Sequence, residues 1–186
     1  EGDVTSTGQT LRGSVGGVEC AEKAFAASDY FAKRSAGPVL EGRKARGIGA
    51  SLFMHGGGFT GSGERMLKGK VAVDLEPGGR LLIRSGSTDI GQGTETVFAQ
   101  IAADAAGIEF SKVRFAVPST TTVPDSGPTV ASRTVMVVGA IVEEASKAIA
   151  EQVEAIRKEE ESWQAAADRL LADRGKVTVL KQYEPP

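Results

Sequence analysis

A glutamine between two glycines, Gly91-Gln92-Gly93, stands directly before a helix-like segment that starts at Thr94. The first amides of a helix have no partner within the helix and lie at the positive end of its dipole. Such a helix start binds anions, and Gln92 offers a ligand both a donor and an acceptor. The same residues also fit an ordinary helix start, with Thr94 as the N-cap and Gln92 exposed, so the turn alone leaves both interpretations open.

A second candidate is the hydroxyl-rich segment 118–134, which Pro124 and Pro128 stiffen before a second predicted helix. Its hydroxyls closest to that helix belong to Ser126, Thr129, Ser132 and Thr134. A stiff loop with donors at a helix start suits a polar, phosphorylated ligand, and Arg133 could pair with a phosphate. The alternative is that these hydroxyls cap the loop's own helix.

Other residues with chemical potential are scarce. His55 is the only histidine and Cys20 the only cysteine, which excludes a histidine-based metal site and an internal disulfide. Asp89 and Glu95 flank the glycine–glutamine turn and could act as an acid–base pair, although Glu95 also fits a simple partner of the helix dipole. The glycine-rich segment 56–64 matches neither a P-loop nor a dinucleotide-binding turn, which favours a bulged strand or a close backbone contact.

The elements that position these loops follow from hydrophobic periodicity. Helices are predicted at residues 15–35, 94–106, 129–161 and 161–174, strands at 48–53, 67–75, 80–85 and 113–117, and an extended segment at 177–180. Pro77-Gly78-Gly79 predicts a hairpin turn, and residues 39–47 are expected to be a charged connector.

This order predicts an α+β fold, a two-layer sandwich. We expect a mixed sheet of about four strands, formed by a hairpin and a strand–helix–strand unit, with long helices packed on one face. The predicted divisions are a lead-in and helix at 1–46, an α/β domain at 47–160, and a C-terminal helix and tail at 161–186.

Composition excludes several classes of protein. The net charge of −2 and the lack of a basic run argue against nucleic-acid or membrane-surface binding. The longest apolar run, 135–142, is far shorter than the ~20 residues that cross a bilayer. A lone cysteine indicates a reducing compartment, and we expect a cytoplasmic protein. The absence of an initial Met and the Pro-Pro end suggest an internal piece of a longer chain.

Together, Gly91–Thr94 and the later segment VPDSGPTVAS at 123–132 resemble the molybdopterin-binding part of the molybdenum hydroxylases, the xanthine dehydrogenase and aldehyde oxidase family. Residues 7–11, 56–64 and 183–186 extend the resemblance over nearly the whole chain.

The resemblance implies a molybdenum–molybdopterin cofactor, with a cytosine dinucleotide as one form, that hydroxylates an N-heterocycle such as a purine, or an aldehyde. The residues that it places at the cofactor are Gly91, Gln92, Gly93, Thr94, Val130, Ala131, Ser132, Arg133 and Thr134. Gln92 would lie beside the molybdenum without ligating it. The residues at 130–134 would contact the cofactor largely through backbone atoms. The general-base glutamate is expected beyond Pro186, so no catalytic residue is assigned here.

The family also implies partners. They are the rest of the molybdopterin subunit and the iron–sulfur (2Fe-2S) and FAD subunits or domains, in an oligomeric enzyme. Two other hypotheses remain: a non-catalytic assembly module that packs through the apolar face of 135–156, and a generic phosphate-binding domain.

Overall fold

The computed structural model describes residues 2–5, 8–53 and 63–184. The chain divides into two compact units, Glu1–His55 and Gly56–Pro186. The sequence interpretations of His55 and of most of segment 56–64 fall outside the described residues.

The first unit contains helices α1 (Gly17–Ala27) and α2 (Tyr30–Ala36) and the short antiparallel pair β1 (Val39–Glu41) and β2 (Lys44–Arg46). The prediction of one continuous helix is wrong because Asp29 adopts a left-handed conformation, with φ of 51°, that interrupts it. Residues 39–47, which were expected to be a charged connector, contain this pair of strands.

The predicted strand at 48–53 does not form. Its centre, Gly49-Ala50-Ser51, offers little side-chain surface to pack on a sheet, and side-chain packing is what stabilises a strand. Among the described residues of the first unit only Ala21 is buried, so this unit has almost no core of its own.

The second unit is built on a mixed four-stranded sheet, as the sequence predicts. Its strands are β3 (Lys70–Glu76), β4 (Arg80–Arg84), β5 (Val113–Phe115) and β6 (Thr178–Gln182), in the order β5-β4-β3-β6. Strands β4 and β5 are parallel, and the other pairs are antiparallel. The β3–β4 hairpin turns at Gly78 and Gly79, both with positive φ, as predicted. The fourth strand is the C-terminal segment rather than residues 48–53.

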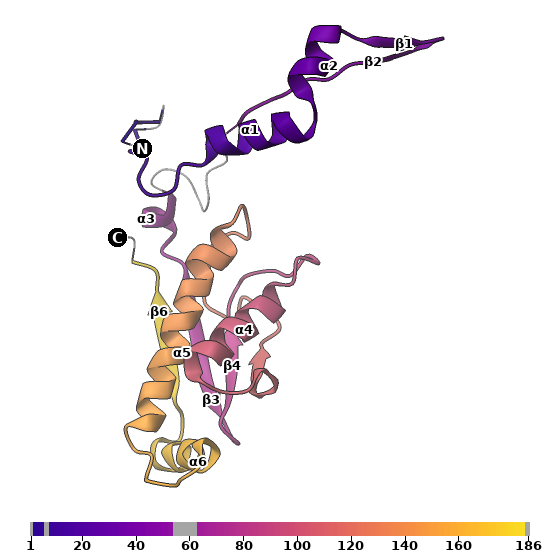
Figure 1. The fold of residues 1–186 in the computed structure, drawn as a ribbon. Helices are drawn as coiled ribbons and strands as arrows, with labels where there is room; N and C mark the ends of the chain where they lie inside the picture. Colours follow the sequence, from indigo (N-terminus) through magenta and orange to yellow (C-terminus); the bar gives the residue numbers. More distant parts are fainter. Residues whose placement is uncertain (1, 6–7, 54–62, 185–186) are drawn as a thin grey trace. The chain divides into compact units, whose positions relative to one another are not determined.

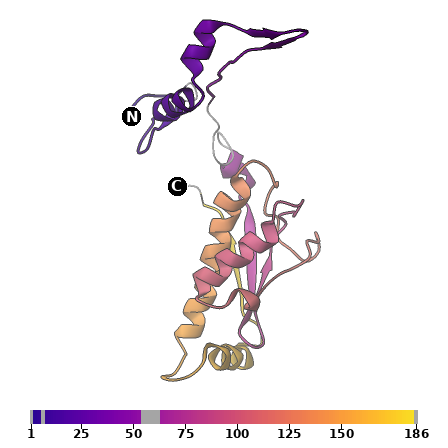
Figure 2. The same cartoon turned by 45° about the vertical axis from the view of Figure 1, so that its right-hand side comes forward.

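Two helices cover one face of this sheet, α4 (Thr94–Ala106) and α5 (Gly139–Glu154) (Figures 1 and 2). Helix α4 has the predicted bounds and ends at Gly107. A π-helical turn, η2 (Thr134–Val138), leads into α5. The helix predicted from residue 129 starts later because Ala131, with φ of 48°, cannot belong to it. The short helices α3 (Gly63–Leu67) and η1 (Phe110–Lys112) lie in connections.

The core lies between the sheet and these helices. The fully buried side chains include Val71, Val73, Leu81, Ile83, Phe98, Val138, Ile141, Val142, Ile149 and Val153. Most of the apolar face of 135–156 is therefore used inside the chain's own fold. The hypothesis of an assembly module that packs through this face is not favoured for that reason.

Helix α6 (Trp163–Arg174) packs against the hairpin end of the sheet. Trp163 Nε1 donates to Gly79 O at 2.9 Å, and Gly78 N donates to Asp168 Oδ1 at 2.7 Å. None of the helices in the described ranges has the length and apolar character needed to cross a membrane.

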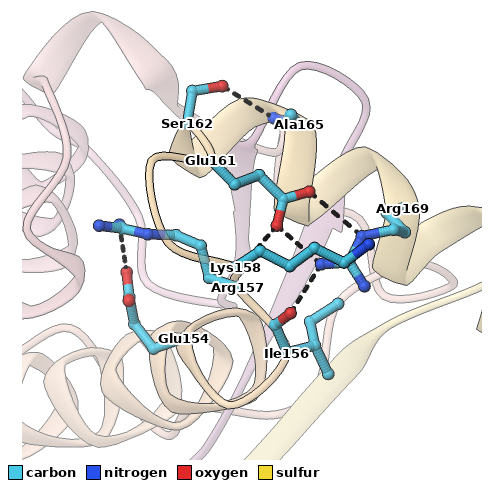
Figure 3. Close-up of polar contacts among 8 residues, drawn as sticks. All are labelled: Glu154, Ile156, Arg157, Lys158, Glu161, Ser162, Ala165 and Arg169. Carbon is cyan, nitrogen blue, oxygen red and sulfur yellow. Dashed lines mark hydrogen bonds and ion pairs between the residues drawn. The ribbon is translucent and has the colours of Figure 1, made fainter.

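A cluster of hydrogen bonds joins the connection between α5 and α6 to helix α6 (Figure 3). Arg169 donates through Nε and Nη2 to the Glu161 carboxylate and through Nη2 to Ile156 O. Glu161 Oε2 also accepts from Lys158 N. The hydrogen bonds from Arg169, with that from Lys158, lower the pKa of Glu161 to about 2.

Candidate functional site

The two candidate loops meet at one hollow of about 490 Å³ in the second unit. Six of the nine predicted site residues line it: Gln92, Thr94, Val130, Ala131, Ser132 and Thr134. A direct bond joins the loops, because Thr88 N donates to Thr129 Oγ1 at 2.9 Å. The remaining wall is supplied by Ile90, Val97, Thr129, Val135 and Met136. No charged side chain is among these described lining residues.

The side chain of Gln92 folds back on its own turn. Its Oε1 accepts from Ile90 N at 2.7 Å, and its Nε2 donates to Thr88 O at 2.9 Å and to Thr94 Oγ1 at 2.7 Å. Gly91 and Gly93 on either side have φ of 100° and 84°, which glycine adopts without strain. Gln92 therefore organises the turn as well as lining the hollow.

Asp89 occupies the amides at the start of α4. Its Oδ1 accepts from Gly91 N at 2.8 Å and from Gly93 N at 3.4 Å, and its Oδ2 accepts from Glu95 N at 3.3 Å. These bonds, that from Gly91 first, lower the pKa of Asp89. The amides of Gly93 and Glu95, expected to be free at this helix start, thus donate to the Asp89 carboxylate. The sequence interpretation considered this carboxylate only for acid–base work.

We call residues Thr129–Ser132 the strap. Val130, Ala131 and Ser132 are exposed at the hollow, and Ala131 is one of four non-glycine residues with positive φ in the described ranges. Buried Thr134 starts the π-helical turn directly after it. Strained backbone and π-helical turns are both frequent at functional sites.

Arg133 does not line the hollow. It is the largest fully buried side chain among the described residues, and its guanidinium pairs with Glu64 of α3. It also donates to the carbonyl oxygens of Ser126 and Pro128. The predicted pairing of this side chain with a ligand phosphate is therefore not seen. Glu64, its partner, was missed because the segment that it ends, 56–64, was interpreted through its glycines and its carboxylate was given no role.

Ser126, another predicted ligand hydroxyl, fastens its loop to the sheet. Its Oγ donates to Lys70 O at 2.7 Å, accepts from Gly86 N at 2.9 Å and lies 2.9 Å from Ser85 Oγ. Ser126 is only 1% exposed. Its hydroxyl therefore forms structural hydrogen bonds within the protein and does not face a ligand.

Comparison with known proteins places the chain in a family. The family model of the molybdopterin cofactor-binding domain matches residues 23–185. The chain is 32% identical over its whole length to the xanthine dehydrogenase/oxidase of Felis catus, of which it covers 14%. It is 30% identical over 61% of its length to a putative xanthine dehydrogenase molybdenum-binding subunit of Escherichia coli K12, of which it covers 15%.

Among solved structures, quinoline 2-oxidoreductase from Pseudomonas putida 86 shares the fold, with a TM-score of 0.67 at 20% identity. That alignment covers 99% of this chain and 28% of the other. The chain thus spans only a small part of the curated relatives, 14% and 15% of the two named above. Because the family model matches most of its length, the chain belongs to the molybdopterin cofactor-binding domain family.

Proposed function

We propose that this chain forms part of a xanthine dehydrogenase-like molybdenum hydroxylase and that its hollow holds part of the molybdopterin cofactor. The observation that carries the proposal is the convergence of the Gly91–Thr94 turn and the strap on that hollow. The two segments are separate in the sequence, and the family resemblance assigns both of them to the cofactor.

The chemistry of the hollow fits a pterin. A pterin is a planar heterocycle whose edge carries hydrogen-bond donors and acceptors. The hollow offers the second lone pair of Gln92 Oε1, whose Nε2 hydrogens are used within the turn, and the hydroxyls of Thr94 and Thr129. Aliphatic side chains such as Val97 and Val130 add apolar contact for the ring faces. This combination of few polar groups among apolar ones is typical of cofactor sites.

The anionic part of the cofactor is expected on the strap side. The Asp89 carboxylate occupies the amides at the start of α4 and repels a phosphate there, whereas the charge of the carboxylate behind the strap, that of Glu64, is compensated by Arg133. In this proposal Gln92 lies beside the molybdenum, and Gly91 and Gly93 let the cofactor approach the backbone.

When bound, the molybdenum would supply the redox chemistry that hydroxylates a carbon atom with oxygen from water. The chain's own residues bind and orient the cofactor, and the general base is assigned to a glutamate outside this chain. The proposed substrate is an N-heterocycle such as a purine, or an aldehyde. Relatives named xanthine dehydrogenase and nicotine 6-hydroxylase support the first class, and an aldehyde oxidoreductase of the same fold is compatible with the second.

The wider setting is part of the same proposal. The cofactor would take the plain molybdopterin or the cytosine dinucleotide form, and electrons would leave through iron–sulfur clusters to FAD on partner chains or domains. We place the enzyme in the cytoplasm as an oligomer. Cysteine usage supports this partition of roles, because one cysteine cannot hold an iron–sulfur cluster.

The test uses the full-length polypeptide with its partner subunits. Gln92→Ala is compared with Gln100→Ala, a matched change at an exposed residue of the same helix region. Residues that orient a metal centre typically cost roughly 10–100-fold in metal affinity or activity when changed, so Gln92→Ala should lose molybdenum and pterin content on this scale. Equal molybdenum content and activity in both variants would refute the role of Gln92.

A further inference from the structure

The guanidinium of Arg133 lies in an enclosed site directly behind the strap. Its Nη1 donates to Ser126 O at 3.0 Å and to Pro128 O at 2.9 Å. Its Nε and Nη2 donate to the two carboxylate oxygens of Glu64, and the Nη2 distance is 3.2 Å. The side chain is fully buried, so the bidentate pair with Glu64 compensates its charge away from water.

Two glycines make room for this group. A Cβ at Gly127 would lie 2.9 Å from Arg133 Nη2, and a Cβ at Gly69 would lie 3.1 Å from the same atom. The Gly69 Cβ would also lie 2.7 Å from Ser126 O. The cradle is therefore shaped for a guanidinium, and a side chain at either glycine would displace it or the carbonyl that it binds.

The same guanidinium is connected to both ends of the strap, by a hydrogen bond at one end and through its own backbone at the other. Pro128, whose carbonyl it binds, comes directly before Thr129, and Arg133 itself comes directly after Ser132. Between these ends Ala131 has φ of 48°, a conformation that side-chain-bearing residues rarely adopt without support. The residue before the strap, Pro128, is bonded through its carbonyl to the guanidinium of the buried ion pair.

We infer that Arg133 and Glu64 are positioning residues that hold the strap in its ligand-facing conformation. This inference rests on the proposed function of the strap. Arg133 fixes both strap ends, and Glu64 keeps the guanidinium in its cradle. Loss of the Glu64 carboxylate leaves a buried, uncompensated cation, which gains by moving toward water and releases Pro128 as it moves. Helix α3 thereby determines the geometry of a site that it does not line.

The test is amide hydrogen exchange on the 186-residue chain, which needs no cofactor. Glu64→Gln removes the charge of the buried pair. Glu154→Gln is the matched control, because Glu154 pairs with Arg157 at the surface, with about half of its side chain exposed. Two amides report on the strap, because Thr88 N donates to Thr129 Oγ1 at 2.9 Å and Met136 N donates to Ser132 O at 3.2 Å. Exchange of these two amides, called strap exchange below, should be at least roughly tenfold faster in Glu64→Gln, relative to any change at Val71 in the sheet core, since local opening then replaces global unfolding as the route.

Glu154→Gln should leave strap exchange within about twofold of the original chain, as expected for an exposed pair. Equal acceleration at the strap and at Val71 would overturn the inference, because the pair would then only stabilise the whole unit. Unchanged exchange would overturn it as well. Glu64→Asp keeps the charge and should restore part of the protection, which provides a second variant should Glu64→Gln fold poorly.

Molybdenum content of the full-length polypeptide separates this inference from the proposed function. Fast strap exchange together with reduced molybdenum in Glu64→Gln supports both. Fast exchange in Glu64→Gln, with full molybdenum content in both Glu64→Gln and Gln92→Ala, supports the positioning role of Arg133 and Glu64 and overturns the cofactor role of the two loops.

Discussion

Replacing Gly127 with alanine measures how firmly the Arg133 guanidinium is held. Gly127 has φ of +75°, and its Cβ would lie 2.9 Å from Arg133 Nη2 and 3.2 Å from both Cζ and Nη1. The guanidinium cannot move away from this methyl group without weakening its bonds to the carbonyl oxygens of Ser126 and Pro128 or to Glu64.

Two separate costs set the magnitude. An alanine in the left-handed region costs roughly 1–2 kcal/mol relative to glycine. Loss of one hydrogen bond from a charged group costs a further ~1.5–3 kcal/mol. We therefore expect Gly127→Ala to lower the free energy of unfolding by about 2.5–5 kcal/mol, a large part of the stability of a domain of this size.

Urea denaturation followed by the fluorescence of Trp163 is the assay. Trp163 is the only tryptophan and lies in the same compact unit as Gly127. The control is Gly107→Ala, since Gly107 has φ of +66° and a Cβ there would meet nothing within 4 Å. This control pays only the backbone cost of roughly 1–2 kcal/mol. Equal losses in the two variants would refute the view that the guanidinium is confined by Gly127.

Two further predictions concern the far end of the second unit. Gly79→Ala should destabilise more than Gly78→Ala and alter Trp163 emission, because both glycines have positive φ but only a Cβ at Gly79 meets the indole, at 2.6 Å; equal effects in urea denaturation would contradict this. The pKa of Glu161 is lowered from 4.5 to about 2, mainly by Arg169, so its ionised carboxylate stabilises the folded state above pH 4.5 and this contribution is lost as the pH falls toward 2. As the pH is lowered from 4.5 toward 2, the midpoint of urea unfolding should decrease less in Arg169→Met than in the original chain. The same decrease in both proteins would argue against the pairing.

The parts of the fold that could be predicted are those in which local and global preferences agree. Helix α4 has an apolar face and a glycine at its end, and the β3–β4 hairpin has alternating strands on both sides of a glycine turn. In each case neighbouring residues carry the whole signal, so the predicted bounds agree with the structure to within a few residues.

The errors occur where a single backbone conformation overrides periodicity. Asp29 and Ala131 each adopt positive φ within a segment of helical spacing, and each divides or shortens the predicted helix. Neither residue type demands this conformation, since alanine is the best helix former. In our inference the conformation at Ala131 is held by contacts of Arg133 with Pro128 and with distant Glu64, which a local pattern does not contain.

The same reasoning separates the two helix starts at the site. Both were predicted as anion sites, because every helix start carries unpaired amides and a positive dipole end. The start of α4 already holds an anion of the chain itself, since Asp89 accepts from Gly91, Gly93 and Glu95, and the low pKa of this carboxyl keeps it charged. A ligand anion at that helix would have to displace a covalently tethered competitor, whose effective concentration is high. If the proposed cofactor binds in the hollow, we expect Asp89 to direct its anionic end away from the start of α4 and toward the strap.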